Sequence, residues 1–144
     1  MDTYTLFKIF NTAILLPWAM MIFLPRWKWT EWMIQTKLPI LIIAAAYFAL
    51  LMMDFIGGQG HGIDFSDLDS IMMAFSRKEV MLIGWLHYLA FDLFVGMWVL
   101  TDAQKIQFPI YLLVPCLILT LMFGPVGFLL YWLIYNILQQ KQTM

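Results

Sequence analysis

Four long runs of hydrophobic residues constrain this sequence more than any other feature. They cover residues 6–24, 38–56, 80–101 and 108–138, and polar connections separate them. A helix needs roughly 20 mainly apolar residues to cross the hydrocarbon core of a bilayer. With 63% hydrophobic and 12% charged residues among 144, the chain has more apolar surface than a soluble core of this size could bury. The sequence therefore predicts an all-α, integral membrane bundle of four transmembrane helices, formed by a single domain over residues 1–144.

Two of the connections between these runs indicate how the spans are arranged. Residues 25–37 combine three tryptophans with Arg26 and Lys28, which is typical of a segment at the membrane–water interface. Residues 102–107 form a much shorter connection. We therefore expect the third and fourth spans to be antiparallel neighbours.

The longest connection, residues 57–79, lies between the second and third spans. It begins with a glycine-rich segment that contains His61, which we expect to be exposed to solvent. Residues 67–75 then have the pattern of a short interfacial helix. Ser66 or Asp67 is expected to cap the N-terminus of that helix.

The fourth run is too long for one straight span. Gly124 and Pro125 interrupt it, and a proline removes a helical hydrogen bond and crowds the preceding turn. Backbone groups freed in this way are tolerated at membrane depth only where protein or a polar cavity satisfies them. We therefore expect a break at these two residues that faces the third span and helps to form a pocket around His87 and Asp92.

The third run carries the ionisable side chains that are least tolerated by a membrane core. Asp92 falls near its middle, where an unpaired carboxylate costs at least about 2.5–3.5 kcal/mol. Asp92 must therefore be paired, protonated or turned towards a cavity. Burial favours the neutral forms of a carboxyl and an imidazole, and such a pair can transfer a proton. We interpret His87 and Asp92 as acid/base candidates, with Tyr88 beside Asp92; the alternative is that Asp92 only packs helices together.

A four-residue spacing places two glycines on the face of the third run that carries Asp92. Gly84, Tyr88, Asp92 and Gly96 share this face, because residues four apart are neighbours on a helix. Glycines in a membrane helix allow a second helix to approach closely. We expect the partner to be the first or the second span.

Three further polar residues lie in or at the ends of the spans. Asp54 and Asp102 end the second and third runs, where a carboxylate is more often an interfacial anchor than a reacting group. They are secondary site candidates. Asn11, in the first run, is a potential hydrogen-bond partner for Asp92, or a contact that only holds helices together.

Charge and cysteine content exclude several classes of function. The net charge of −1 gives no basic surface of the kind that binds nucleic acid. A single cysteine excludes an intrachain disulfide and a thiolate metal cluster. The candidate ligands lack the spacing of a helical metal-binding pair, so we predict neither a metal nor a cofactor.

The N-terminal segment does not have the pattern of a signal peptide. Its first 20 residues contain one lysine and no small-residue cleavage site. We expect residue 1 to begin the mature chain and the protein to reside in a bacterial inner membrane.

The third run and the helix break together resemble a known family. Residues 84–96, GWLHYLAFDLFVG, are followed by Trp98 and by Thr-Asp-Ala at residues 101–103. Residues 123–131 read FGPVGFLLY, and the opening run contains Asn11. These segments are similar to the abscisic-acid-deficient-four-like family, the neoxanthin-synthase-like membrane proteins of plant plastids and their bacterial relatives. The resemblance extends over nearly the whole chain.

The resemblance implies a four-helix membrane protein of carotenoid biosynthesis. Plant members are required to convert violaxanthin to neoxanthin, an isomerisation in which an acid protonates an epoxide oxygen and a base removes a proton from the adjacent polyene carbon. His87 and Asp92 match the family motif, which implies an intramembrane isomerase acting on a carotenoid or other isoprenoid. Residues expected to contact the substrate are Trp85, Phe91, Trp98, Asn11, Gly124 and Pro125.

Two other functions remain open at this stage. The first is a non-catalytic, carotenoid- or lipid-binding membrane subunit that presents substrate to a partner enzyme. The second is a small proton-coupled carrier that uses Asp92. Four spans form a thin wall for a transporter, so a carrier would require a homo-oligomer, which the sequence leaves open. In every case membrane lipids surround the protein.

Overall fold

The computed structural model describes residues 2–57 and 63–142; His61 lies outside them. All regular secondary structure within these residues is helical, which confirms the predicted all-α class. The chain divides into two compact units, one of residues 1–15 and 38–90 and the other of residues 16–37 and 91–144. The helices of the described residues are α1 (Thr3–Ala13), α2 (Leu15–Phe23), α3 (Lys28–Thr36), α4 (Leu38–Ile56), α5 (Leu68–Ser76), α6 (Lys78–Lys105), α7 (Ile110–Phe123) and α8 (Pro125–Gln142).

Three helical stretches among the described residues are long and apolar enough to cross a membrane. They are Thr3–Phe23, Lys28–Ile56 and Lys78–Lys105, and they contain most or all of the first three predicted spans. The fourth predicted span is divided between α7, which has 14 residues, and α8. At 1.5 Å per residue α7 is about 21 Å long, less than the roughly 30 Å of a hydrocarbon core. The structure therefore supports a membrane protein with three candidate spans, and a bundle of four is not confirmed.

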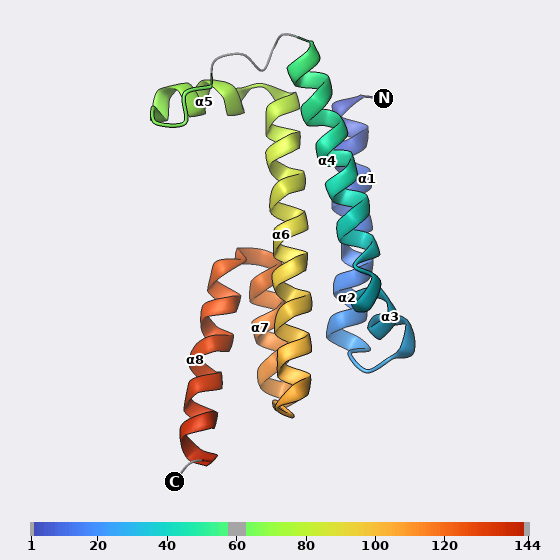
Figure 1. The fold of residues 1–144 in the computed structure, drawn as a ribbon, viewed down its shortest axis with the longest axis vertical. Coiled ribbons are helices and arrows are strands. Elements are labelled where there is room, and N and C mark those ends of the chain that lie inside the picture. The colour runs from blue at the N-terminus through green and yellow to red at the C-terminus, as the bar shows by residue number, and fades with distance from the viewer. Residues whose placement is uncertain (1, 58–62, 143–144) are drawn as a thin grey trace. The chain divides into compact units, whose positions relative to one another are not determined.

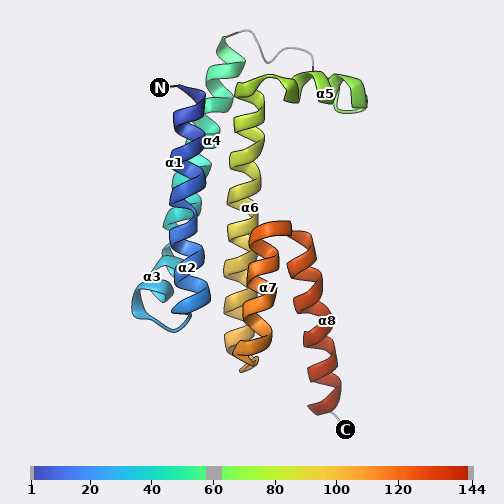
Figure 2. The ribbon, with the colours of Figure 1, turned by 180° about the vertical axis from the view of Figure 1, so that it is seen from behind.

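The first unit contains α1, α4, α5 and the beginning of α6. Both α1 and α4 run alongside α6, and α5 extends sideways from its start (Figures 1 and 2). Within α4, all of which the structure describes, Ile43 is the only buried residue. The exposed surface of α4 is therefore apolar, as expected for a helix in contact with lipid.

The short helix predicted between the second and third spans is confirmed as α5. Its N-cap is Asp67, whose side chain accepts a hydrogen bond from the backbone N–H of Ser70 at 2.9 Å. Ser66, the alternative cap, instead donates its hydroxyl to Asp64 at 2.6 Å. That bond, together with one from the backbone N–H of Ser66, holds the pKa of the exposed Asp64 carboxyl below its usual range.

The second unit contains α2, α3, α7, α8 and the end of α6. A tight turn follows α6, in which the N–H of Phe108 donates to the carbonyl of Ala103 at 2.9 Å. The chain then runs back along α6 as α7 and reverses again as α8 (Figures 1 and 2). The predicted antiparallel arrangement of the third run and the start of the fourth is thus confirmed.

The predicted break in the fourth run is confirmed at Gly124. This residue has φ +37° and ψ −89°, α7 ends just before it, and α8 begins at Pro125. Residues with a side chain rarely adopt such a backbone conformation, whereas glycine does so without steric cost. Proline is favoured at the first position of the new helix. A side chain at Gly127 would overlap Thr120, so the absence of one lets α8 pack closely against α7. The fourth run therefore forms a helical hairpin and not a single span.

Candidate functional site

The carboxyl group of Asp92 lies directly against the break between α7 and α8. Asp92 is only 9% exposed. A Cβ atom at Gly124 would lie 2.5 Å from Oδ1 of Asp92 and 3.1 Å from its Cγ. The missing side chain at Gly124 thus makes room for the carboxyl, and the expectation that the break faces the third span is confirmed. The pocket expected around His87 and Asp92 stays a prediction.

The break places the ends of two helices beside Asp92. The helix α7 ends at Phe123 and α8 begins at Pro125. The C-terminus of a helix carries a partial negative charge and the N-terminus a partial positive charge. Both helix ends therefore contribute to the polar surroundings of the Asp92 carboxyl.

One turn after Asp92, α6 packs closely against a tryptophan side chain. A Cβ atom at Gly96 would lie 2.5 Å from Cη2 of Trp18, and Trp18 is 1% exposed. Since Trp18 belongs to α2, within the first predicted span, the expected close contact is confirmed at Gly96. At Gly84 the expectation was wrong: a Cβ atom there would lie 2.6 Å from Phe75 of α5, because α5 supplies an aromatic ring at the start of α6.

An aromatic cluster holds the end of α6 to α8. The ring of Trp98 lies 5.7 Å from that of Phe128 and 6.2 Å from that of Tyr131. The Tyr131 hydroxyl donates to Oδ2 of Asp102 at 2.7 Å, and Tyr131 is buried. Asp102 therefore has a structural partner, in agreement with its reading as an anchor. Sequence reasoning missed Tyr131, which had only its place at the end of the FGPVGFLLY segment to indicate it.

In the first unit, two residues expected to bind substrate contact each other. The indole Nε1 of Trp85 donates to Oδ1 of Asn11 at 3.3 Å. Trp85 also packs against Phe7, with ring centres 5.8 Å apart, and against Tyr88 at 5.3 Å. The hydrogen bond that the structure shows for Asn11 is therefore with Trp85, and the pairing of Asn11 with Asp92 stays a prediction.

His87 occupies an exposed face of α6. Its ring lies 5.8 Å from that of Tyr47 in α4, and His87, Phe91 and Trp98 are all exposed, whereas Asp92 is buried. His87 belongs to the first unit and Asp92 to the second. Their pairing as acid and base, and the roles of the other candidate residues, stay predictions.

Asp54 has a charged partner that the sequence did not indicate. It forms an ion pair with Arg77, which directly precedes α6, and the Asp54 side chain is 9% exposed against 29% for Arg77. The two residues are 23 positions apart, so no local pattern connects them. The reading of Asp54 as an anchor at the end of a span agrees with this contact.

Comparison with known proteins identifies a family. Searches of curated proteins and of solved structures gave no match. The model of the ABA DEFICIENT 4-like family matches residues 5–131, a range that includes Asp92, the helix break and Tyr131. Because this match covers most of the chain, the protein is a member of the ABA DEFICIENT 4-like family.

Proposed function

We propose that this protein is an intramembrane isomerase of carotenoid or related isoprenoid metabolism, in which Asp92 transfers the proton. The observation that carries the proposal is the buried Asp92 carboxyl against the break at Gly124. Ionisable side chains within a membrane span are costly and usually functional. Family membership supports the same class of protein.

The proposed reaction opens an epoxide without a change of oxidation state. Asp92 protonates the epoxide oxygen, the C–O bond breaks, and a base removes a proton from the adjacent polyene carbon. The products are an allene and a tertiary alcohol, and one proton is delivered for each proton removed.

The exposed face of α6 carries aromatic residues that are suited to contact with the substrate. His87, Phe91 and Trp98 are exposed at spacings that place residues on one side of a helix. Aromatic rings offer a long polyene large apolar contacts. We propose that Phe91 and Trp98 contact the substrate. His87 as the base, and Tyr88 beside Asp92, are what the resemblance to the family motif implies.

The proposed setting is a bacterial inner membrane. A hydrophobic substrate would enter from the lipid around the three helices that are long and apolar enough to cross a membrane. Neither step requires a metal, a cofactor or a second copy of the chain.

Turnover by the purified protein tests the proposal. Full-length protein in lipid nanodiscs is incubated with an epoxy-carotenoid such as violaxanthin, and products are separated by chromatography and identified by absorption spectrum and mass. An isomer of unchanged mass is expected from the wild type, whereas Asp92→Asn should form it at least about 100-fold more slowly. Asp102→Asn is the matched control, because Asp102 is a second carboxylate of α6 that bonds Tyr131; it should retain turnover. A wild type that binds epoxy-carotenoids but converts none of them would overturn the proposal.

The exposed aromatic face favours a second candidate, a non-catalytic subunit that binds carotenoids or lipids. Phe91 and Trp98 would then contact a polyene that is passed to another enzyme. A polyene that co-purifies with the protein and remains unchanged, with equal amounts bound to wild type and Asp92→Asn, would favour this candidate over the isomerase.

A further inference from the structure

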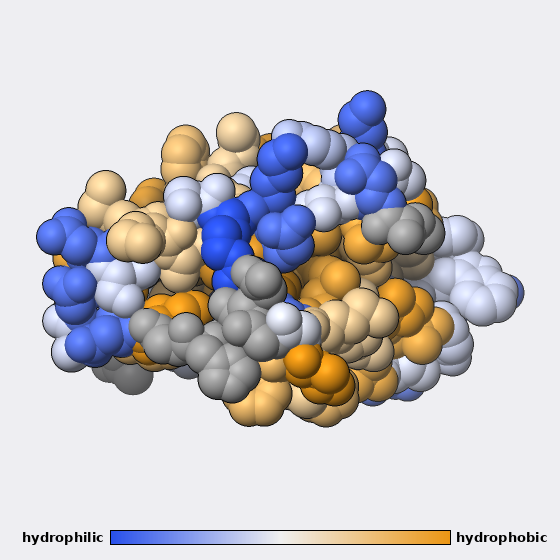
Figure 3. Space-filling view, turned by 90° about the horizontal axis from the view of Figure 1, so that it is seen from above, coloured by the Kyte–Doolittle hydropathy of each residue, from blue (hydrophilic) through white to orange (hydrophobic). Residues whose placement is uncertain are grey.

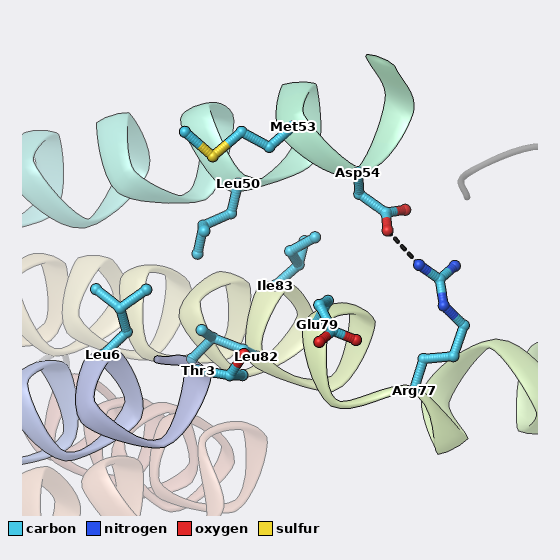
Figure 4. Close-up of a pocket in the computed structure, with 9 residues that line it drawn as sticks. All are labelled: Thr3, Leu6, Leu50, Met53, Asp54, Arg77, Glu79, Leu82 and Ile83. Atoms are coloured by element: carbon cyan, nitrogen blue, oxygen red, sulfur yellow. Dashed lines mark hydrogen bonds and ion pairs between the residues drawn. The ribbon is translucent and has the colours of Figure 1, made fainter. Parts of the chain in front are cut away.

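The first unit contains a cavity of about 540 Å³ at one end of its helices. It lies between the start of α1, the end of α4 and the start of α6 (Figure 4). Ligand pockets in proteins usually measure roughly 300–1,000 Å³. The cavity is therefore large enough for part of a small organic molecule.

The lining of this cavity is apolar on one side and charged on the other. Leu6, Leu50 and Ile83 line it from three different helices. The charged side is formed by the Asp54–Arg77 ion pair, drawn as a dashed line in Figure 4, and by Glu79. The cavity therefore has the two-sided character of a site for an amphiphile.

The charged side faces the end of the candidate spans. Asp54 lies in the last turn of α4, and Glu79 lies in the first turn of α6. The apolar residue Ile83 lies further along α6, and Leu50 lies one turn before Asp54 in α4. Hydrophilic side chains are visible among hydrophobic ones when this end is viewed directly (Figure 3). A molecule in the cavity would thus have its polar end near the membrane surface and its apolar part towards the membrane interior.

The charges in the cavity lining favour an uncharged polar group over an anionic one. Asp54 and Glu79 are two carboxylates against the single guanidinium of Arg77, so the formal charge of the three is −1. Arg77 already pairs with Asp54. A phosphate or carboxylate would meet a net repulsion here. A hydroxyl group would not, because it can donate to a carboxylate and accept from a guanidinium.

We propose that this cavity binds the polar end of an uncharged, hydroxyl-bearing lipid. Its hydroxyls donate to Asp54 and Glu79, and its chain lies against Leu6, Leu50 and Ile83. A neutral membrane lipid and a hydroxylated isoprenoid share this chemistry. The proposal does not depend on the isomerase function, since Asp92 belongs to the other unit.

Ligands that share one acyl chain and differ only in the polar group test this proposal. Binding of monooleoylglycerol and of oleate to the full-length protein in detergent is measured by native mass spectrometry. The wild type should bind monooleoylglycerol roughly tenfold more tightly than oleate, the ratio that a modest charge repulsion produces. Equal affinity for the two lipids would overturn the proposal.

Two variants separate the charge effect from the cavity itself. Glu79→Gln makes the lining neutral, so it should reduce the preference over oleate to roughly threefold or less. Leu50→Trp should fill the cavity and abolish saturable binding of both lipids. Glu31→Gln is the matched control, because Glu31 lies in α3 of the other unit. Monooleoylglycerol binding that survives Leu50→Trp would contradict the assignment to this cavity.

Lipid extracted from the purified wild type distinguishes the two natural sources. A neutral glycerolipid or a hydroxylated isoprenoid that is absent from Leu50→Trp would support the proposal and identify the source. An anionic phospholipid that is lost in Leu50→Trp would contradict it.

Discussion

Asp54 and Asp92 are both largely shielded from solvent, and the two units hold them in different ways. The side chain of Asp54 is 9% exposed although the residue as a whole is only half-buried, whereas Asp92 is buried as a whole residue. Asp54 faces the guanidinium of Arg77, whereas Asp92 faces the glycine at a helix break. The ion pair accounts for Asp54 as an anchor at the end of a span. Asp92 lies in the middle of a candidate span, where an ionisable side chain is usually functional, so Asp92 and not Asp54 is the candidate for proton transfer.

The largest change in stability is expected from Gly124→Ala. The methyl group would overlap the Asp92 carboxyl and would occupy a residue with φ +37°. Overpacking and backbone strain together should cost about 3 kcal/mol in the free energy of unfolding. Thermal unfolding in detergent measures this cost. In the Asp92→Ala background the same substitution should cost roughly 1 kcal/mol, because only the strain remains. Equal costs in the two backgrounds would show that the cost of Gly124→Ala does not depend on the Asp92 carboxyl.

A smaller loss is expected from Asp54→Asn. It leaves the Arg77 guanidinium without its ion-pair partner, at a side chain that is 29% exposed. Because water screens part of that charge, the loss should be about 2 kcal/mol, below the value for a fully buried pair. The double variant Asp54→Asn/Arg77→Gln should recover most of it. A double variant that is as unstable as the single one would show that the ion pair is not the reason for the loss.

These expectations depend on contacts that the sequence revealed to different degrees. Local patterns limited the cap of the short helix to Ser66 or Asp67, and they predicted the break at Gly124 and the approach of that break to the third run. Capping and proline chemistry are decided within a few residues, and the membrane requires that freed backbone groups be satisfied. The same reasoning could not find Arg77 as the partner of Asp54, since any cation near a span end fitted the pattern equally well.

The fourth run shows a second limit of the sequence. Its hydrophobicity is compatible with a kinked span or with a hairpin. Which of them forms depends on the direction of the chain after Gly124, and a φ of +37° at this residue reverses it. The contact of Gly84 with Phe75 was missed for a related reason. A short helix can be oriented in several ways, and the sequence does not indicate which neighbouring residue its aromatic side chain contacts.

Tyr131→Phe examines a third carboxylate, Asp102, whose hydrogen-bond donor is a tyrosine hydroxyl. The substitution removes the hydroxyl that donates to Asp102 at 2.7 Å and leaves the ring in place. The loss should be about 1.5 kcal/mol, typical of a hydrogen bond to a charged group. Tyr135→Phe is the control, because the Tyr135 ring also packs against Tyr131; it should cost less. Equal melting temperatures for wild type and Tyr131→Phe would show that the hydrogen bond to Asp102 does not contribute to stability.

The smallest effect is expected at the exposed Asp64. Hydrogen bonds from Ser66 lower the pKa of this carboxyl, so their contribution is present above roughly pH 4 and is lost as the pH falls through the lowered pKa. Ser66→Ala should raise the pKa of Asp64 towards its usual value, as followed by NMR of the carboxyl carbon. An unchanged pKa in Ser66→Ala would mean that the hydroxyl does not hold this loop.

Turnover of an epoxy-carotenoid by Asp92→Asn tests the central claim most directly. The amide has nearly the shape of the acid and is tolerated near a helix N-terminus, so the melting temperature should stay close to that of the wild type. Because an amide cannot donate the proton, turnover should fall by about 10²–10⁴-fold. Full turnover in a stably folded Asp92→Asn variant would contradict the account and would leave Asp92 as a residue that only stabilises the helix break.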